Sequence, residues 1–535
     1  MKKTTRKIIS ILLAVLMMLP AAALLCAAGD TLYTTTIPTV YLAGQGTKLW
    51  GTSENGKEEL IYPFEIPDGY IGDRAKELIS PLLDGIVAYD WDEYCDTLSD
   101  AIIGIVGSVG LDENGEPAEG QHAWPCDPKK NVKTADGRYT VYSHTHAGAG
   151  YVFNYDWRTD PYAVAKDLNT YIEAVKRETG FEKVNLVGRC LGATILLVYL
   201  SEYGNDSIEK TVLVSGGFSG FESMGALFSG NFQFDSDALT RFADDYLSDG
   251  DKSEDLVFGL LDVVISLLNQ VQMLGMPVNL IDQFWSKVSD KVIPKVLLAS
   301  YGSMPSFWSF VSDEYYDDAK EFLFGEDEEK YAGLIEKIDH YHYDVAQRYG
   351  EIIDKANADG NQVSIISKYG LQIIPIVKDP DIMSDGYLET VSSSFGATCS
   401  TVNGTLDKDY LAEAKENGTD KYISVDKQID ASTCRYRDRT WFIKYMAHMD
   451  NPDCINDILC AILDYDGDMT VFDDEAFPQY LFCEGKEGAA TISPLTKENS
   501  APANNWSNSK IENLIRLLVN VIEVLIKYLG QALAN

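Results

Sequence analysis

The chain has 535 residues, of which 45% are hydrophobic and 11% aromatic, so it can form one large domain with insertions or two ordinary domains. Its 82 acidic and 44 basic residues give a formal net charge of −38. A surface with this excess of acid repels nucleic-acid phosphates and anionic membranes, so we exclude nucleic acid as the main partner. The net charge alone does not identify a substrate.

Residues 1–28 have the pattern of a secretory signal peptide. A short apolar run over 8–19 follows a basic start and is followed by small residues within 21–28; the basic residues are Lys2, Lys3, Arg6 and Lys7. The run is too short for a transmembrane span, so we predict export to the cell surface or the medium. Cleavage would leave a net charge near −42 (−38 − 4). A lipoprotein anchor at Cys26 is the weaker alternative, because the bulky Leu25 precedes it.

Export permits disulfides, and we expect one or two of them. Apart from Cys26 and Cys190, the available residues are Cys95, Cys126, Cys399, Cys434, Cys454, Cys460 and Cys483. Their spacing does not resemble a zinc site, and it does not define which cysteines pair.

From about residue 36, short apolar runs alternate with helical patterns. This alternation is typical of a mainly parallel sheet covered by helices on both faces. Within 30–217, which we assign to the first part of an α/β core, the predicted strands are 38–43, 138–143, 151–154, 183–187 and 211–215, and the predicted helices are 160–179 and 193–203.

Residues 218–360 then show amphipathic helical patterns with little strand signal. The strand pattern resumes at 362–367, 371–377 and 440–445, within a second part of the core over 361–495. Because the sheet needs these later strands to be complete, we interpret 218–360 as a helical lid inserted into one fold. The alternative is a separate helical domain.

Residues 496–535 form a polar linker followed by an amphipathic helical pattern over 511–533. Polar and charged residues interrupt this pattern too often for a transmembrane span. We expect a helix that docks on the body or pairs with another chain. The alternative is a helix that lies on a membrane or lipid surface.

The strongest chemical signal is a Gly-x-Cys-x-Gly motif between a predicted strand and a predicted helix. Gly188, Arg189, Cys190, Leu191 and Gly192 form it. This is the nucleophile elbow of α/β-hydrolases, with cysteine in the serine position. The turn is strained and crowded, which explains the glycines, and the helix N-terminus behind it stabilises a thiolate. The alternatives are a small buried side chain at Cys190 or an inactive copy of the elbow.

Three segments resemble the lecithin–cholesterol acyltransferase group of α/β-hydrolases. The first segment is residues 153–158, before the elbow, which read Phe-Asn-Tyr-Asp-Trp-Arg. Residues 39–49 are similar to the first oxyanion segment of that group, and residues 303–306 are similar to part of its lid. The resemblance extends over about residues 36–450. It departs from the group at the cysteine nucleophile and at Ala43, where proline is usual.

The resemblance also implies an acid at Asp385. Residues 384–393 are similar to the group's Asp-Gly-x-Val-Pro turn, with Glu389 near the position of the proline. The acid of an α/β-hydrolase follows the nucleophile in the chain and lies after a late strand, as Asp385 does. Asp379 and Asp381 are the reserve candidates, and an ordinary surface turn is the alternative.

His448 is the candidate base among six histidines. It follows the predicted strand at 440–445, so the order Cys190, Asp385, His448 is the expected one. His144 and His146 precede the elbow, His340 and His342 are expected on a solvated helix, and His122 lies in a polar insertion. His448 would take the thiol proton, Asp385 would orient the imidazole, and the backbone N–H groups of Leu191 and Gln45 would bind the oxyanion.

An acidic segment near the end of the core partly matches a calcium loop. Asp464, Asp466, Asp468 and Glu475 have the required spacing, but Met469 stands where the loop needs glycine, so we predict no metal there and no cofactor elsewhere. We expect residues 471–472 and 480–482, which follow these aspartates, to form a hairpin.

We therefore expect an exported carboxylic ester hydrolase or acyltransferase that acts on a small-molecule or lipid ester. An inactive protein of the same fold that binds an apolar ligand is the second hypothesis. A surface interaction protein that works through the C-terminal helix is the third.

Overall fold

The computed structural model describes residues 33–45, 48–53, 56–64, 69–123, 139–141, 151–233, 283–284, 286–448, 450, 454–485 and 490–500. The predicted signal peptide and the predicted helix over 511–533 lie outside these residues.

The centre of the fold, as far as the chain is described, is a sheet of seven strands in the order β16-β15-β14-β9-β8-β7-β2. Neighbouring strands are parallel, except that β16 runs antiparallel to β15. The strands are β2 (Thr39–Leu42), β7 (Val184–Arg189), β8 (Ile208–Val214), β9 (Gln362–Tyr369), β14 (Thr440–Lys444), β15 (Tyr480–Glu484) and β16 (Thr491–Pro494).

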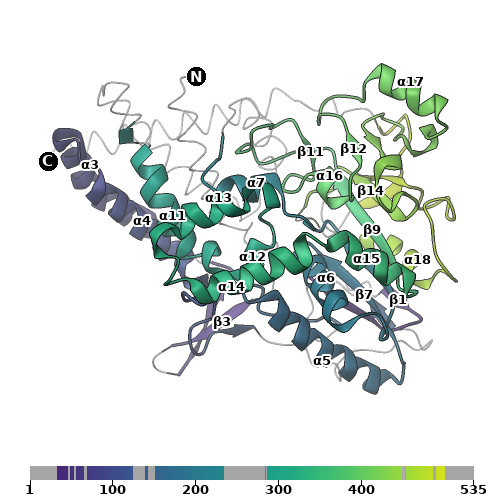
Figure 1. Cartoon of the computed structure of the whole chain (residues 1–535), viewed down its shortest axis with the longest axis horizontal. Helices are drawn as coiled ribbons and strands as arrows, with labels where there is room; N and C mark the ends of the chain where they lie inside the picture. The colour runs from purple at the N-terminus through teal and green to yellow at the C-terminus, as the bar shows by residue number, and fades with distance from the viewer. Residues whose placement is uncertain are drawn as a thin grey trace.

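Both faces of this sheet are buried. Successive side chains of a strand enter opposite cores: Leu186 belongs to one hydrophobic cluster and Val187 to the other. Helices α5 (Pro161–Thr179), α6 (Leu191–Tyr203) and α15 (Tyr349–Ala358) contribute to the first cluster, whereas α18 (Ile455–Asp464) contributes to the second (Figure 1). This two-sided burial explains the consecutive apolar residues within the strands, such as Val212, Leu213 and Val214 in β8.

Helix α5 shows how local sequence sets an element's bounds. Asp160 caps its first turn by accepting a hydrogen bond from the N–H of Tyr162, and Pro161 is the first helical residue. Gly180 ends the helix at a φ of 75°.

A helical segment connects the neighbouring strands β8 and β9. It contains α7 (Glu222–Phe228), η3 (Val288–Val292), α11 (Ile293–Leu298), η4 (Tyr301–Ser303), α12 (Pro305–Trp308), α13 (Asp313–Leu323), η5 (Gly325–Asp327), α14 (Ala332–Tyr341), η6 (His342–Ala346) and α15. Its buried aromatic side chains, such as Phe307 and Phe310, belong to the same hydrophobic cluster as one face of the sheet. In its described part, the segment therefore shares a core with the sheet.

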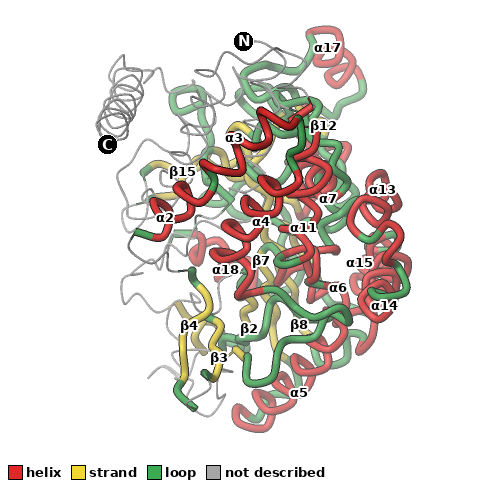
Figure 2. The backbone as a smooth tube through the Cα atoms, turned by 90° about the vertical axis from the view of Figure 1, so that its left-hand side faces the viewer, coloured by secondary structure: helices red, strands yellow, loops and turns green. Residues whose placement is uncertain are grey.

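A second group of helices precedes the core strands β7 and β8 in the chain. Helices α2 (Tyr70–Glu77), α3 (Ile79–Ala88) and α4 (Asp92–Val106) are followed by η1 (Gly107–Val109). The sequence patterns did not indicate these helices. Figures 1 and 2 show α3 and α4 at one end of the molecule, where α4 contacts η3 and α11.

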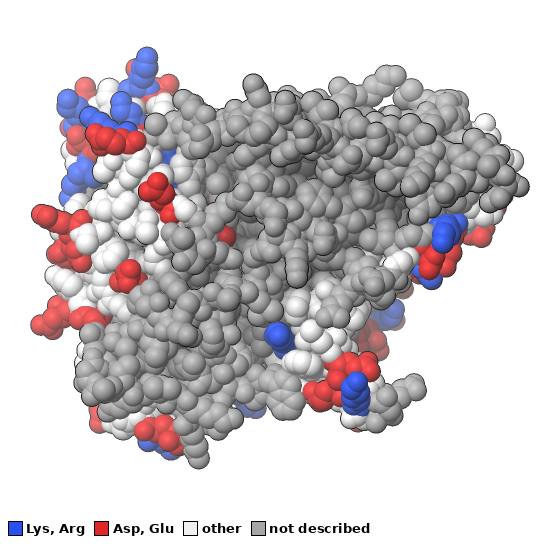
Figure 3. Space-filling view, turned by 180° about the vertical axis from the view of Figure 1, so that it is seen from behind, with Lys and Arg blue, Asp and Glu red and all other residues white. Residues whose placement is uncertain are grey.

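Exposed ion pairs join these two helical groups. Lys287 and Lys291 pair with Asp92, and Lys295 pairs with Asp96 and Asp100. Figure 3 shows acidic side chains interspersed with Lys and Arg on the described part of the back face. Such exposed pairs contribute little stability, so packing rather than charge holds the helices together.

Among the described residues, four small sheets lie outside the central one. Their strands are β3 (Leu49–Thr52) with β4 (Glu58–Tyr62) and β5 (His122–Ala123), β1 (Tyr33–Thr35) with β6 (Tyr139–Val141), β10 (Leu371–Gln372) with β11 (Met383–Ser384), and β12 (Thr398–Cys399) with β13 (Ile429–Asp430). The remaining helices are α16 (Thr390–Ser393), α17 (Lys408–Glu416), η7 (Asp420–Tyr422), η8 (Ala431–Thr433) and η9 (Arg437–Arg439).

Several predicted strands differ from the observed ones. The segment 151–154 contributes only an isolated bridge between Val152 and Tyr41, and the strand predicted at 138–143 pairs with β1 outside the central sheet. The strand predicted at 371–377 stops after Gln372, because the chain turns to pair with β11. The expected hairpin is wrong as well, since β15 pairs with β14 and β16 instead.

Among the described residues, Cys95, Cys190, Cys399, Cys434, Cys454 and Cys483 have free thiols. These six cysteines therefore form none of the expected disulfides. In the described part of the chain, no helix is both long and apolar enough to span a membrane.

Candidate active site

Cys190 lies on the sharp turn between β7 and α6. Its backbone has φ 52° and ψ −122°, a conformation that costs free energy for any residue with a side chain. Its N–H donates to the carbonyl of Val214, and its carbonyl accepts from the N–H of Ala193. The neighbouring strand and the helix thus hold the strained turn, which presents the thiol at the carboxyl end of the sheet.

The glycines around this turn are required by close backbone contacts. A Cβ atom on Gly188 would lie 2.7 Å from the carbonyl oxygen of Gly192, and one on Gly192 would lie 2.4 Å from that of Leu42. A Cβ atom on Gly44 would lie 2.8 Å from Cβ of Cys190. The chain after β2 therefore packs directly against the cysteine.

His448 and Asp385 form a buried pair. Nδ1 of His448 lies 2.7 Å from Oδ2 of Asp385, and the backbone N–H of His448 donates to the Asp385 carbonyl. The other carboxylate oxygen, Oδ1, accepts from the N–H groups of Leu388 and Tyr387. These contacts fix both the acid and the imidazole.

The charges of this site shift three pKa values. Burial opposes ionisation of Asp385, but the charge and hydrogen bond of His448 outweigh it and hold the pKa of Asp385 below its ordinary value. Burial likewise opposes protonation of His448, yet the charges of Asp385 and Cys190 raise its pKa to about 9. For Cys190, burial is outweighed by His448, by Arg189 and by the N–H of Leu191, so the thiol pKa falls below its ordinary value. The arrangement favours a thiolate beside an imidazolium.

Both predicted oxyanion groups belong to residues in segments next to the cysteine. The backbone N–H of Leu191 is close enough to stabilise the thiolate, and Gln45 follows Gly44, which contacts Cys190. The side-chain amide of Gln45 donates to the hydroxyl of Tyr301, and the predicted oxyanion donor is its backbone N–H.

Aromatic side chains surround the reacting groups. The ring of Tyr387 lies 5.8 Å from the ring of His448. The hydroxyl of Tyr155 donates to the carbonyl of Ala43, the residue before Gly44. Cys190 and Tyr387 both pack against the hydrophobic cluster that includes the helices between β8 and β9.

Two further charged groups, which the sequence reasoning missed or left without a role, stand behind the pair. Lys368 on β9 and Arg189 at the end of β7 both donate to the backbone carbonyl of His448. The signal for Lys368 was its position near the end of Gln362–Tyr369, a strand that is buried along its whole length, where a charged residue needs a buried partner.

Glu389 lies close to the acid turn. Its Oε1 accepts a hydrogen bond from the N–H of Glu222 at the start of α7. Burial, and then the charges of Glu222 and Asp385, raise its pKa to about 8. Glu389, which stands near the position where the resemblance places a proline, thus links the turn of Asp385 to α7.

The other candidate residues lie apart from the pair. Asp379 and Asp381 are exposed. His122 is partly exposed, and His340 is exposed as expected, but His342 is buried and pairs with Asp313, which corrects its expected solvation. His144 and His146 lie outside the described residues.

No group of three or more His, Cys, Asp or Glu side chains that could hold a metal occurs among the described residues. In the segment that resembles a calcium loop, one carboxylate oxygen of Asp464 instead accepts from the N–H of Thr36.

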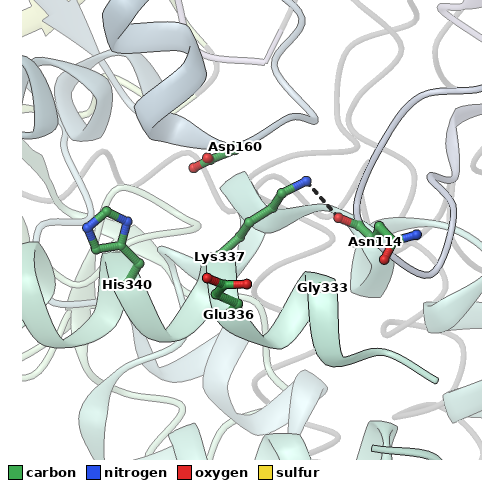
Figure 4. A pocket seen from close by; sticks show the side chains of 6 residues that line it. All are labelled: Asn114, Asp160, Gly333, Glu336, Lys337 and His340. Atoms are coloured by element: carbon green, nitrogen blue, oxygen red, sulfur yellow. Dashed lines mark hydrogen bonds between the residues drawn. The ribbon is translucent and has the colours of Figure 1, made fainter. Parts of the chain in front are cut away.

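A polar pocket of about 350 Å³ lies away from these residues. It is lined by Asn114, Asp160, Gly333, Glu336, Lys337 and His340. Figure 4 shows Lys337 reaching across it to the backbone carbonyl of Asn114, with Asp160 above and His340 on the same helix. None of Cys190, Asp385 and His448 lines this pocket, so it is separate from the candidate site.

Comparison with known proteins places the fold. A family model described as the alpha/beta hydrolase fold matches residues 128–254, which include the elbow. No curated protein sequence matches the chain. Among solved structures, a chain in "The crystal structure of Tle4-Tli4 complex" aligns at 14% identity and a TM-score of 0.18. This alignment covers 36% of the present chain and about half, 48%, of the other. The mostly parallel sheet and the family match together show that this chain has the α/β-hydrolase fold, whose members are mostly hydrolytic enzymes.

Proposed function

We propose that this chain is an exported carboxylic ester hydrolase or acyltransferase that acts on a lipid-like ester through Cys190, His448 and Asp385. One arrangement carries the proposal: a cysteine on a strained turn next to a histidine whose Nδ1 lies 2.7 Å from a buried carboxylate. A cysteine that merely fills space needs neither the strain nor the pair.

The reaction has two halves. The thiolate of Cys190 attacks the ester carbonyl carbon, and the backbone N–H groups of Leu191 and Gln45 bind the oxyanion. When the tetrahedral intermediate collapses, the C–O bond breaks and the leaving alkoxide takes a proton from Nε2 of His448. Water or a second alcohol then gives its proton to His448 and attacks the thioester. The acyl group leaves as acid or new ester, and Cys190 is released as thiolate.

An apolar acyl group fits the surroundings of the cysteine. Cys190 packs against the cluster that contains Phe218, Phe307 and Phe310 from the segment between β8 and β9. We propose that this segment, residues 218–360, acts as the lid over the acyl site. The pattern of residues 1–28 supports export, and the tail over 496–535 is proposed to dock, self-associate or contact a lipid surface.

Hydrolysis of p-nitrophenyl esters of short and long acids tests the function. Cys190→Ala should lose turnover of every ester, and intact mass spectrometry of the parent should show the acyl group on Cys190. Cys460→Ala, which removes a partly exposed cysteine on α18, is the matched control and should keep full activity.

If Cys190→Ala hydrolyses the esters as fast as the parent, Cys190 is structural and the proposal is wrong. If neither protein turns over any ester, but both bind the same long-chain fatty acid, the chain is a ligand-binding protein instead.

A further inference from the structure

Two buried cations meet on one backbone carbonyl behind the candidate base. The ammonium of Lys368 donates to the carbonyls of Ala447 (3.1 Å), His448 (3.2 Å) and Asp450 (2.8 Å). Nη2 of Arg189 donates to the same carbonyl of His448. The cations come from β9 and β7, which lie on either side of β8, whereas the carbonyls lie on the loop after β14.

Burying these cations is costly unless they serve a purpose. Lys368 is 0% exposed and Arg189 is 7% exposed, and the described hydrogen-bond partners of both side chains are carbonyl dipoles. Nε of Arg189 is buried without a partner among the described residues. Carbonyl dipoles compensate a buried charge less well than a carboxylate does.

The cations complete a three-sided hold on His448. Its N–H donates to the carbonyl of Asp385, its Nδ1 contacts the Asp385 carboxylate, and its carbonyl accepts from both cations. The backbone N–H and carbonyl of His448 are thereby both held in place. The protein, rather than solvent, therefore sets the direction in which Nε2 points.

We propose that Lys368 and Arg189 are positioning residues that hold the His448 loop and supply the positive charge that keeps Cys190 as a thiolate. This inference rests on the proposed function, because it assigns these residues to the same reacting cysteine. It also accounts for cysteine at the elbow, since a serine hydroxyl would gain little from nearby positive charge at neutral pH.

The charges around the site have the required signs. His448 and Arg189 face Cys190 as cations, and the hydroxyls of Tyr155 and Tyr387 face it as neutral groups. In the ionised site, Cys190 and Asp385 are anions and His448 is a cation, so the site lacks one positive charge without the two further cations, and Asp450 adds a further negative charge beside Lys368.

Lys368 also sets an upper pH limit for this effect. It faces Arg189, Asp385, Asp450 and Cys483. Burial, and then the charge of Arg189, lower the pKa of Lys368 to about 7. The ammonium charge is therefore present below about pH 7 and lost above it, so its removal should matter most below pH 7.

The rate at which iodoacetamide alkylates Cys190, measured from pH 5 to pH 10 on the full chain, tests the proposal. Tryptic digestion and mass spectrometry report Cys190 separately from the other cysteines, because residues 190–210 contain no other cysteine. The variants are Lys368→Met, Arg189→Met and Arg189→Lys. The matched control is Lys210→Met, which removes a buried ammonium that also donates to carbonyls, those of Ile462 and Tyr465 at the end of α18.

Lys368→Met and Arg189→Met should each raise the alkylation midpoint of Cys190 by about one pH unit, which lowers the rate about tenfold below both midpoints. Arg189→Lys keeps the charge, so its alkylation midpoint should lie close to that of the parent. Lys210→Met should leave the midpoint unchanged.

The inference is overturned if the midpoint stays the same in both methionine variants, or if Lys210→Met moves it equally. Circular dichroism identifies a variant that does not fold, and in that case Arg189→Gln, which removes the charge but keeps a donor for the His448 carbonyl, takes its place and should raise the midpoint likewise. The alkylation readout does not need ester turnover, so the two hypotheses are tested separately. A parent that hydrolyses no ester would contradict the proposed function, whereas an unchanged midpoint would contradict the role of the two cations.

Discussion

Replacing Asp385 by Asn tests the hydrogen-bonded pair most directly. The substitution keeps the size of the side chain but removes the charge 2.7 Å from Nδ1 of His448. An Asn amide can also offer N–H to Nδ1, which favours the wrong tautomer of the imidazole. Asp385→Asn should therefore impair both orientation and protonation of the base.

The magnitude follows from the pKa of His448. Its value of about 9 lies about 2.5 units above that of an ordinary histidine, which corresponds to about 3 kcal/mol in favour of the imidazolium. Burial acts against this shift, and Asp385 makes the largest favourable contribution, so we assign about 2 kcal/mol or more to the carboxylate. Allowing for the tautomer as well, kcat/KM for a p-nitrophenyl ester should fall about a hundredfold or more.

The control is Asp381→Asn, which removes an exposed carboxylate from the same loop and should change kcat/KM less than twofold. The alkylation midpoint of Cys190 should rise in Asp385→Asn, because the imidazolium that stabilises the thiolate is lost. Turnover of Asp385→Asn within twofold of the parent would refute the assignment of the acid.

Two further predictions concern packing and pH. Gly44→Ala places a methyl group 2.8 Å from Cβ of Cys190, so ester turnover should fall at least tenfold. The control is Gly51→Ala, whose Cβ would lie 3.4 Å from its nearest neighbour and which should retain turnover. Equal kinetics of the two variants would contradict the close approach of Gly44 to Cys190. Glu389 has a raised pKa of about 8, so its contribution to stability is present below its ordinary pKa of about 4.3 and is lost as the pH rises through about 8. Glu389→Gln stays neutral, keeps the acceptor for the N–H of Glu222, and should match the parent's Tm at pH 5 but exceed it by a few degrees at pH 9, as measured by calorimetry. The exposed Glu413→Gln should show no such gain, and a lower Tm of Glu389→Gln at both pH values would show that its charge is needed.

The local sequence predicted the core well at positions where the backbone geometry permits only certain residue types. The fold class is confirmed, and the strand, Cys190 and helix follow one another as the motif requires. Gly188 and Gly192 were readable because their positions exclude any side chain. The order of Cys190, Asp385 and His448 could also be read along the chain, since parallel strands bring their carboxyl ends to one edge.

Other elements left no clear local signal. Helix α3 was missed because Pro81 and Gly85 interrupt it, and a short apolar run of this kind also fits a strand or a loop. The predicted strand at 151–154 makes only one bridge, since pairing depends on what lies beside it rather than on its own apolar residues.

By itself, the sequence determined the α/β-hydrolase core, its strained cysteine turn and the residue types of the candidate acid and base. Those features depend on local backbone geometry and on chain order, both of which the sequence states directly. Only the tertiary structure decided that Lys368 and Arg189 share the carbonyl of His448 and that Glu389 reaches α7. These contacts join residues 80 to 259 positions apart, and nothing in the local pattern around a buried charge says which distant backbone group will compensate it.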